Sequence, residues 1–391
     1  MKTRRLTLIA TAIVATSLAS LVAQSPNDKA LRIYVVDTEG GKAALFVSPS
    51  GETALVDSGN PGGRDTERIM AAINDAGVKQ IDYLISTHYH VDHIGGMQEL
   101  AAKIPITHFA DHGPNIEEHE QVQGFQQAYA ALYGKAQHLV VKPGDRIPIA
   151  GLDWRIVTAG GQVLKTPLPG GGTPNPACAT YTPQDPNPAD ENSQSVGSVI
   201  TFGRFRAIDL GDLLWYNEHE LMCPNNPIGT VDLYLVTHHG LDRSNAPVVV
   251  HGVQPRVAVM QNGTRKGAGA QAMMTMRTSP GLEDIWQLHW SYGAGIEQNS
   301  AGVFIANVED AETIAGVLTS PPRGGGAGRG QGGAGAPSGP GGGPPQGAGR
   351  GGGAQAHTPA YWIKVTARQD GSFTVTNSRN GFTKQYAARE R

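Results

Sequence analysis

One short stretch, residues 86–96, constrains what this chain can fold into more than any other part of it. It contains three histidines and one aspartate close together, and it follows residues 81–86, which have the composition of a buried strand. Imidazole nitrogens and carboxylate oxygens are the ligands that zinc, manganese and iron accept. A loop of solvated polar residues would not need so many such groups at one strand end. The stretch therefore predicts a metal site at the end of a buried strand.

The spacing of these four residues predicts two neighbouring metal positions. Alternate side chains of an extended segment share a face, so His88 and His90 should point to the same place. The chain must then turn at Asp92 for His93 to reach that place as well. One pair therefore suits one metal ion, and the other pair suits a second ion close by.

Three further motifs follow other predicted strands. Asp57 ends one strand, and Asp212 comes after a strand pair that ends in Gly-Asp. His238 and His239 begin a His-His-Gly sequence that follows the predicted strand 231–237. Strand ends are thus where the potential ligands of this chain collect.

Taken in order, the motifs resemble those of the metallo-β-lactamase superfamily, whose members are mostly hydrolytic metalloenzymes. The resemblance covers about residues 31–262 and depends on His-x-His-x-Asp-His, Gly-Asp and His-His-Gly. It implies an α/β (α+β) fold, namely the four-layer αββα metallo-β-lactamase sandwich. The alternation of predicted strands and helices agrees with such a layered architecture.

The resemblance also implies a role for each motif residue. Two divalent ions, zinc or manganese, are expected. The expected metal ligands are His88, His90, Asp92, His93, Asp212 and His238. Asp212 would bridge the two ions, and Asp57 would hold the ligand loop through hydrogen bonds. The expected catalytic residues are Asp92, Asp212 and His239.

The choice between His238 and His239 depends on the geometry of the strand before them. Adjacent side chains of an extended segment point to opposite faces, so one histidine should bind metal and the other should not. We favour His238, because it directly follows the strand. His239 would then be a proton donor or support a ligand from behind.

Many superfamily members supply a third histidine to the first metal, and this chain lacks its usual sequence context. The equivalent place reads Asp-Glu-Asn-Ser, where Asn192 could offer an amide oxygen as a weak ligand. Such a ligand, or water in its place, would favour a harder ion such as manganese and leave the first site partly occupied. Another histidine, His112, could support or face the site, or be a hydrogen-bonded loop residue.

The His-His-Gly ending and the Ser-Val-x-x-Val strand before Gly-Asp are most similar to the soluble nuclease-like domain of ComEC-type competence proteins. The expected function is hydrolysis of an ester by a metal-bound hydroxide at a dinuclear centre, with a phosphodiester favoured. Two alternatives stay open. One is hydrolysis of a lactone or a β-lactam amide at the same site, and the other is an inactive metal-binding envelope protein.

The rest of the chain indicates export and a single main domain. Residues 1–23 have a basic start and an apolar run, which predict a cleaved signal peptide and a periplasmic or secreted protein. Residues 24–320 would form the catalytic domain, and the Gly- and Pro-rich segment 321–357 a flexible insertion or linker. Residues 358–391 predict a β-hairpin that returns to the main sheet.

Charge and cysteine content limit the partners. The formal net charge is −3, so a small-molecule or phosphodiester substrate is expected and a stable nucleic-acid complex is not. No membrane span is expected after signal cleavage, and the sequence indicates no oligomeric state. The two cysteines, Cys178 and Cys223, are expected to form a disulfide in an oxidising compartment, and the alternative is two independent buried thiols.

Overall fold

We analysed the protein as a computed structural model, which describes residues 29–390 except 118–119, 183, 185 and 309–359. The expected signal peptide, residues 1–23, and the expected Gly- and Pro-rich insertion, residues 321–357, lie outside the described residues. Among the described residues, no helix combines the length and apolar character that a membrane crossing requires.

Two sheets form the centre of the molecule. The first has the strand order β20-β19-β18-β1-β2-β3-β4-β5-β6. Its strands are β1 (Leu31–Val35), β2 (Ala44–Val47), β3 (Thr53–Val56), β4 (Ile81–Ile85), β5 (Ile106–Asp111), β6 (Gln137–Val140), β18 (Ile363–Ala367), β19 (Phe373–Asn377) and β20 (Thr383–Tyr386). Strands β3 to β6 are parallel, and the other pairs are antiparallel.

The second sheet has the order β17-β16-β15-β14-β12-β11-β8-β7, and β9 pairs with β8. Its strands are β7 (Arg146–Ile147), β8 (Asp153–Ala159), β9 (Gln162–Val163), β11 (Gly197–Phe202), β12 (Phe205–Asp209), β14 (Leu233–Leu235), β15 (Val257–Met260), β16 (Asp284–His289) and β17 (Ile305–Asn307). A separate small ribbon joins β10 (Thr173–Pro174) to β13 (Asn225–Asn226).

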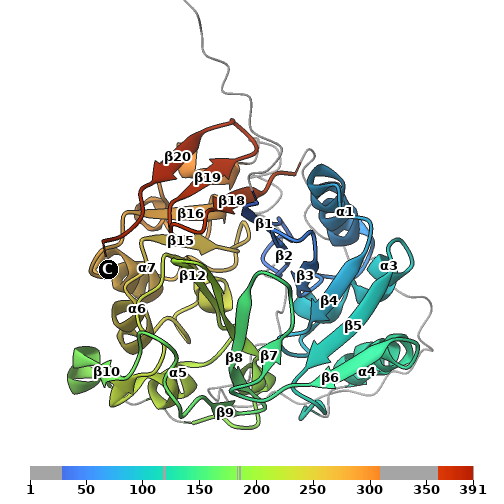
Figure 1. Ribbon diagram of the computed structural model, residues 1–391, viewed down its shortest axis with the longest axis horizontal. Coiled ribbons are helices and arrows are strands. Elements are labelled where there is room, and N and C mark those ends of the chain that lie inside the picture. The colour runs from blue at the N-terminus through green and yellow to red at the C-terminus, as the bar shows by residue number, and fades with distance from the viewer. Residues whose placement is uncertain (1–28, 118–119, 183, 185, 309–359, 391) are drawn as a thin grey trace, which may run out of the picture.

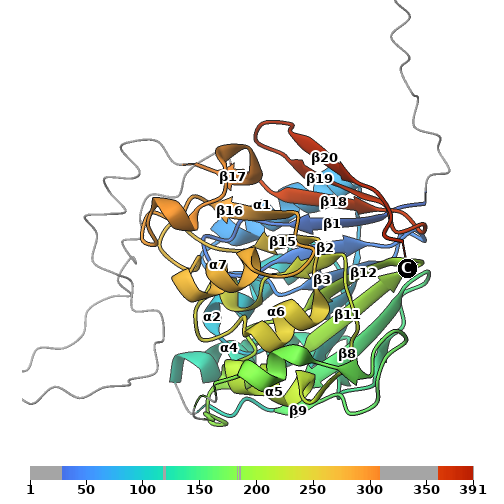
Figure 2. The ribbon, with the colours of Figure 1, turned by 90° about the vertical axis from the view of Figure 1, so that its left-hand side faces the viewer.

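Helices cover the outer face of each sheet, which gives four layers (Figures 1 and 2). The α-helices are α1 (Arg64–Ala76), α2 (Val91–Ile94), α3 (Met97–Ala101), α4 (Glu120–Tyr133), α5 (Trp215–Met222), α6 (Pro247–Val253) and α7 (Ala270–Arg277). Short 3-10 turns are η1 (Pro176–Thr180), η2 (Glu191–Gln194), η3 (Thr237–Gly240), η4 (Ile296–Gln298) and η5 (Gly302–Phe304). The αββα sandwich expected from the sequence is therefore present.

The burial of the strands follows from these layers. The largest apolar cluster lies between the sheets and includes Phe46 and Trp154, whose rings meet edge to face. Strands β2 and β3 are buried on both faces, because the α1 layer covers their outer side. In β18 and β19 buried residues alternate with half-buried ones, as in a sheet that packs on one face only. β18 pairs with β1, so the expected C-terminal hairpin extends the first sheet, and β20 adds a third strand.

Two local features position the loops of the second sheet. Cys178 in η1 and Cys223 at the end of α5 form a disulfide, as predicted. A buried ion pair between Lys42 and Asp209, the last residue of β12, fixes the end of this strand and joins the two sheets. The Asp209 carboxylate also accepts the Gly211 N–H at 3.0 Å, and this holds the turn that carries Asp212.

Candidate metal centre

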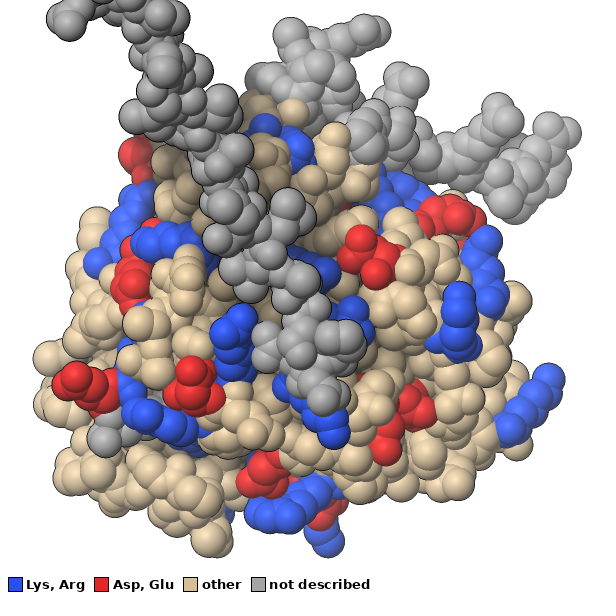
Figure 3. All heavy atoms as spheres, turned by 45° about the horizontal axis from the view of Figure 1, so that its top comes forward, with Lys and Arg blue, Asp and Glu red and all other residues tan. Residues whose placement is uncertain are grey.

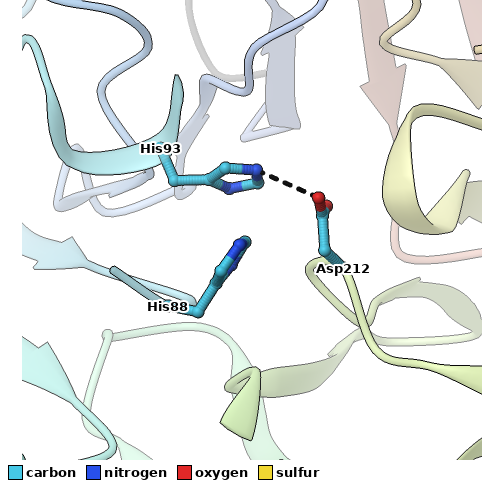
Figure 4. Close-up of side chains that lie close together, drawn as sticks. All are labelled: His88, His93 and Asp212. Carbon is cyan, nitrogen blue, oxygen red and sulfur yellow. Dashed lines mark ion pairs between the residues drawn. The ribbon is translucent and has the colours of Figure 1, made fainter. Parts of the chain in front are cut away.

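Loops after β3, β4, β12 and β14 meet at one edge of the sandwich and bring the motif residues together. The loop after β4 runs into the single turn of α2 and carries four of them. Figure 4 shows His88 and His93 from this segment pointing toward Asp212, which comes from the other sheet. One potential ligand atom from each of these three residues lies within 4.8 Å of those of the other two, and all three side chains are buried.

Asp57 fixes the loop after β4. One carboxylate oxygen accepts the Thr87 N–H and the other accepts the Thr87 hydroxyl, both at 2.8 Å. His93 Nδ1 lies 2.8 Å from Asp57 Oδ2, and because a carboxylate only accepts, Nδ1 carries the hydrogen. In a neutral His93 ring, Nε2 is then a bare lone pair directed into the site. The expected role of Asp57 therefore agrees with its contacts.

His239 is oriented in the same way from the opposite side. Its Nδ1 lies 3.1 Å from the carbonyl oxygen of Gln261, so Nδ1 donates and a neutral ring has a bare Nε2. That Nε2 lies 3.2 Å from Asp212 Oδ2 and 3.4 Å from Asp92 Oδ2. His93 Nε2 is similarly 3.3 Å from Asp212 Oδ2. In neutral rings these lone pairs would oppose carboxylate oxygens, so the arrangement calls for a proton or a metal ion between them.

These contacts define the Asp92 half of the centre, which consists of Asp92, His93 and His239. The Nε2 atoms of His93 and His239 and the Oδ1 atom of Asp212 are buried without hydrogen-bond partners among the described residues. Buried polar atoms rarely lack partners, and a site for an ion is one of the standard reasons. The residues therefore fit a divalent metal ion.

The His90 half consists of His88, His90, Glu117 and Asp190. His88 Nε2 and His90 Nδ1 lie 3.0 Å apart, close to the ~3.3 Å that separates two nitrogens on one tetrahedral zinc ion. Burial first, and then the charges on His93 and His90, hold the pKa of His88 well below its usual value. His88 is therefore a neutral imidazole with a lone pair to offer.

Carboxylates stand on the outer side of His90, where the sequence suggested an amide. Potential ligand atoms of His90, Glu117 and Asp190 lie within 4.8 Å of one another. His90 Nε2 is 3.4 Å from Glu117, and Asp190 accepts the Asn192 N–H at 3.1 Å. Asn192 Oδ1 is buried without a partner, which keeps it available as a weak ligand. Glu117 belongs to no sequence motif. Asp190 begins the Asp-Glu-Asn-Ser stretch, from which we took only Asn192 as a ligand, so our reading of the sequence missed both carboxylates.

The structure differs from our expectation for the His-His-Gly motif. Both His238 (φ 53°) and His239 (φ 56°) have left-handed backbones, so the rule for alternate faces of a strand does not apply. It is His239, rather than His238, that joins Asp92 and His93. His238 Nδ1 lies 3.0 Å from Ser244 Oγ, and its Nε2 lies 3.5 Å from Asp212 Oδ2. His238 is thus beside the Asp92 half and not part of it.

His112 is a hydrogen-bonded histidine behind the ligand loop. Its Nε2 lies 2.6 Å from Glu191 Oε1 in η2. The Glu191 carboxylate also accepts the Tyr89 N–H at 3.3 Å and the Ile116 N–H at 3.1 Å. The pair therefore ties η2 to the loop that carries His88 and His90.

The charges of the centre are strongly coupled in the metal-free protein. Burial alone would lower the pKa of His93, but the carboxylates of Asp212, Asp57 and Asp92 outweigh burial and raise it to about 10. Burial would raise the pKa of Asp212, but His239, His93 and His238 hold it well below its usual value. A proton on His93 thus supplies the positive charge that the carboxylates need. A metal ion would replace that proton, so metal binding should release it.

Comparison with known proteins agrees with this geometry. Residues 37–186 match the sequence profile described as the Metallo-beta-lactamase superfamily. The chain carries a metallo-beta-lactamase superfamily domain. The superfamily consists generally of metal-dependent hydrolases, and the predicted family is therefore confirmed.

Curated relatives of the domain share only part of their length with it. ComE operon protein 3 of Bacillus subtilis (strain 168) is 25% identical over 48% of this chain and 20% of its own length. Hydroxyacylglutathione hydrolase of Rhodopseudomonas palustris (strain HaA2) is 30% identical over 34% of this chain and 44% of its own. Coenzyme F420H(2) oxidase of Methanothermobacter marburgensis is 31% identical over 28% and 26%. The chain thus spans less than half of each of these relatives.

Two solved structures that this chain matches each share 16% sequence identity with it. One is Igni18, a metallo hydrolase from Ignicoccus hospitalis KIN4/I, with a TM-score of 0.36 over 59% of this chain and 82% of its own. Another is CmlA, a diiron β-hydroxylase from Streptomyces venezuelae, with a TM-score of 0.36 over 66% and 48%.

Proposed function

We propose that the protein is an exported hydrolase that uses two divalent metal ions to cleave an ester, with a phosphodiester as the favoured substrate. The observation that carries the proposal is the orientation of His93 and His239. Each ring donates from Nδ1 to a buried partner and turns Nε2 toward the carboxylates of Asp92 and Asp212. The Asp92 half would hold one ion and the His90 half the other. Asp212 would lie between them, because it reaches both His88 and His239.

Divalent ions at such a centre acidify water and neutralise negative charge that develops on the substrate. The protein's own residues orient the reaction. Ser244 Oγ donates to the Leu213 carbonyl at 2.6 Å, so it must accept from His238 Nδ1–H. Burial lowers the pKa of His238 to about 3, so the ring is neutral near pH 7. Its bare Nε2 can then accept a hydrogen bond from the attacking water, beside Asp212.

Some features support hydrolysis in general, and others favour a particular type of ester. The superfamily profile and the relative named hydroxyacylglutathione hydrolase support hydrolysis in general. The resemblance of the His-His-Gly and Ser-Val-x-x-Val motifs to the nuclease-like domain of ComEC-type competence proteins favours a phosphodiester. On the face shown in Figure 3, basic and acidic side chains are interspersed. This mixture of charges and the net charge of −3 do not favour a long nucleic acid, which requires a continuous basic surface.

A substrate panel tests the proposal. The purified full chain is loaded with zinc or manganese and assayed with bis(p-nitrophenyl) phosphate, a carboxylic ester, a lactone and a β-lactam. We expect close to two metal ions per chain, turnover of the phosphodiester, and loss of activity with a chelator. Turnover of the lactone or β-lactam alone would retain the hydrolase and change the substrate. Metal binding without any turnover would support a metal-binding envelope protein instead.

Export is supported by residues 1–23 and by the disulfide between Cys178 and Cys223, since disulfides persist mainly in oxidising compartments. Fractionation of cells that produce the full chain tests this part. We expect a shortened, disulfide-bonded protein in the periplasm or medium. A full-length, reduced protein in the cytosol would contradict it.

A further inference from the structure

A lysine outside every motif reaches the open edge of the metal centre. Lys266 Nζ contacts Asp92 Oδ2, the same oxygen that faces His93 Nε2 at 3.6 Å and His239 Nε2 at 3.4 Å. The Lys266 side chain is 36% exposed and that of Asp92 is 19% exposed, whereas the His93 and His239 side chains are almost fully buried. The ammonium group therefore approaches the centre from the solvent side.

The loop that carries this lysine is built to reach the centre. The Gly263 N–H donates to the Lys266 carbonyl at 2.9 Å and closes a tight turn. A Cβ on Gly267 would lie 1.9 Å from the His239 carbonyl oxygen, so only glycine lets the loop lie so close to the ligand. A Cβ on Gly40 would be 3.1 Å from the Lys266 Cβ, so the lysine stem rests against Gly40.

Lys266 and a metal ion would compete for one oxygen atom. An ion held by the Asp92 half would lie about 2 Å from Asp92 Oδ2. Two cations on one oxygen repel each other strongly at the low effective dielectric of a half-buried site. Loading the centre should therefore displace the ammonium group.

Lys42, another lysine near the centre, is held in place and contrasts with Lys266. It is 2% exposed and held by Asp209, and its backbone N–H donates to the Asp92 carbonyl at 3.1 Å. Lys266 has a flexible four-carbon stem and partial exposure, so it can turn toward another anion at the mouth of the site. A substrate in the centre would place its own oxygens there.

We propose that Lys266 pairs with Asp92 in the metal-free protein and, once the centre is loaded, binds an anionic oxygen of the substrate. The centre would thus select substrates that carry negative charge beside the bond that is cleaved, such as phosphate esters. This inference depends on the proposed function for its substrate, although its two tests need no turnover.

The first test measures metal affinity with zinc alone. Metal-stripped full-length wild type, Lys266→Met and Lys266→Arg are titrated against a chromophoric chelator. Lys103→Met is the matched control, because Lys103 forms an exposed ion pair with Glu67 on the helical layer. We expect Lys266→Met to bind zinc about tenfold more tightly, as for the loss of one charged hydrogen bond. Lys266→Arg and Lys103→Met should resemble wild type. Unchanged or weaker zinc binding by Lys266→Met would overturn the proposal.

The second test measures the binding of inorganic phosphate to the zinc-loaded proteins by calorimetry. We expect Lys266→Met to bind phosphate about tenfold more weakly than wild type, and Lys266→Arg to bind within about threefold of it. Equal phosphate affinity in wild type and Lys266→Met would overturn the anion-binding role. If both tests succeed and no ester is cleaved, the proposed function falls while Lys266 keeps its role toward metal and anion. If esters are cleaved and either test fails, the proposed function stands and the role of Lys266 falls.

Discussion

The two halves of the metal centre differ in how strongly hydrogen bonds fix the orientation of their imidazole rings. In the Asp92 half, a buried carboxylate or carbonyl orients each imidazole from behind, at 2.8 Å for His93 and 3.1 Å for His239. In the His90 half, His90 Nε2 contacts Glu117 at 3.4 Å, and both side chains are about a quarter exposed. Metal ligands depend on such partners for their orientation and basicity. The imidazoles of the Asp92 half are therefore already oriented without metal, whereas the contact that orients His90 is longer and more exposed.

The largest effect should come from Asp212, because it is shared by both halves. We expect Asp212→Asn to lose metal from both and to reduce ester hydrolysis more than about a hundredfold, beyond the loss from an outer partner. Metal content per chain and the rate on bis(p-nitrophenyl) phosphate measure this. Asp153→Asn is the control, since Asp153 is an exposed partner of Arg155. Full metal content and activity in Asp212→Asn would refute the whole assignment.

The adjacent histidines His238 and His239 should differ by about tenfold. Removing a ligand should cost more than removing a neighbour that accepts one hydrogen bond, so we expect about a hundredfold loss for His239→Ala and about tenfold for His238→Ala. Only His239→Ala should lower the metal content of the Asp92 half. Equal metal loss in both variants would show that His238 is also a ligand.

The motifs predicted the fold and much of the centre, because a strand end followed by ligand-type residues is a local signal. The structure brings His88, His90, Asp92, His93 and Asp212 together, and their roles as metal ligands stay predictions. For the His-His-Gly motif, the strand geometry on which we chose His238 is absent from the structure. We expected an extended strand over residues 231–237, but β14 ends at Leu235 and both histidines adopt positive φ. That conformation is rare for residues other than glycine, and no sequence pattern indicated it.

The remaining residues of the site could not be predicted, since they depend on the packing of distant segments. Glu117 meets His90 from a loop that follows β5, and Lys266 meets Asp92 from a loop of the other sheet. Lys42 and Asp209 likewise form a pair across the sheets. One charged residue in a loop is usually solvated, so its sequence gives no sign of the partner that the fold supplies.

Substitution of one supporting carboxylate in each half, Asp57 and Glu117, compares the two halves directly. Asp57→Asn should weaken metal binding by the Asp92 half about tenfold to a hundredfold, because it removes the acceptor that fixes His93. Glu117→Gln should weaken the His90 half less than about tenfold, given its longer and more exposed contact with His90. Chelator competition with each variant measures both affinities. A larger loss of metal affinity in Glu117→Gln than in Asp57→Asn would show that the His90 half, and not the Asp92 half, depends more on its supporting carboxylate.

The smallest expected effect concerns Glu218, a buried carboxylate outside the centre, which shows what burial does where no histidine compensates. Burial raises the pKa of Glu218 to about 8, against the N–H groups of Ala246 and Asn245 that hydrogen-bond its oxygens. Because the folded pKa lies above the ordinary 4.5, the folded state binds more protons between these values. The stability that Glu218 contributes must therefore fall as pH rises from about 4.5 to 8.

In Glu218→Gln that dependence disappears, although the amide N–H₂ opposes a backbone N–H and costs stability at every pH. We therefore expect the stability advantage of wild type over Glu218→Gln to shrink by about 1 kcal/mol per pH unit between pH 6 and pH 8. Denaturant unfolding of both proteins in chelator, at several pH values, measures the difference. A constant difference would mean that Glu218 is ionised throughout, and that two backbone N–H groups suffice for a buried carboxylate where Asp212 has three histidines.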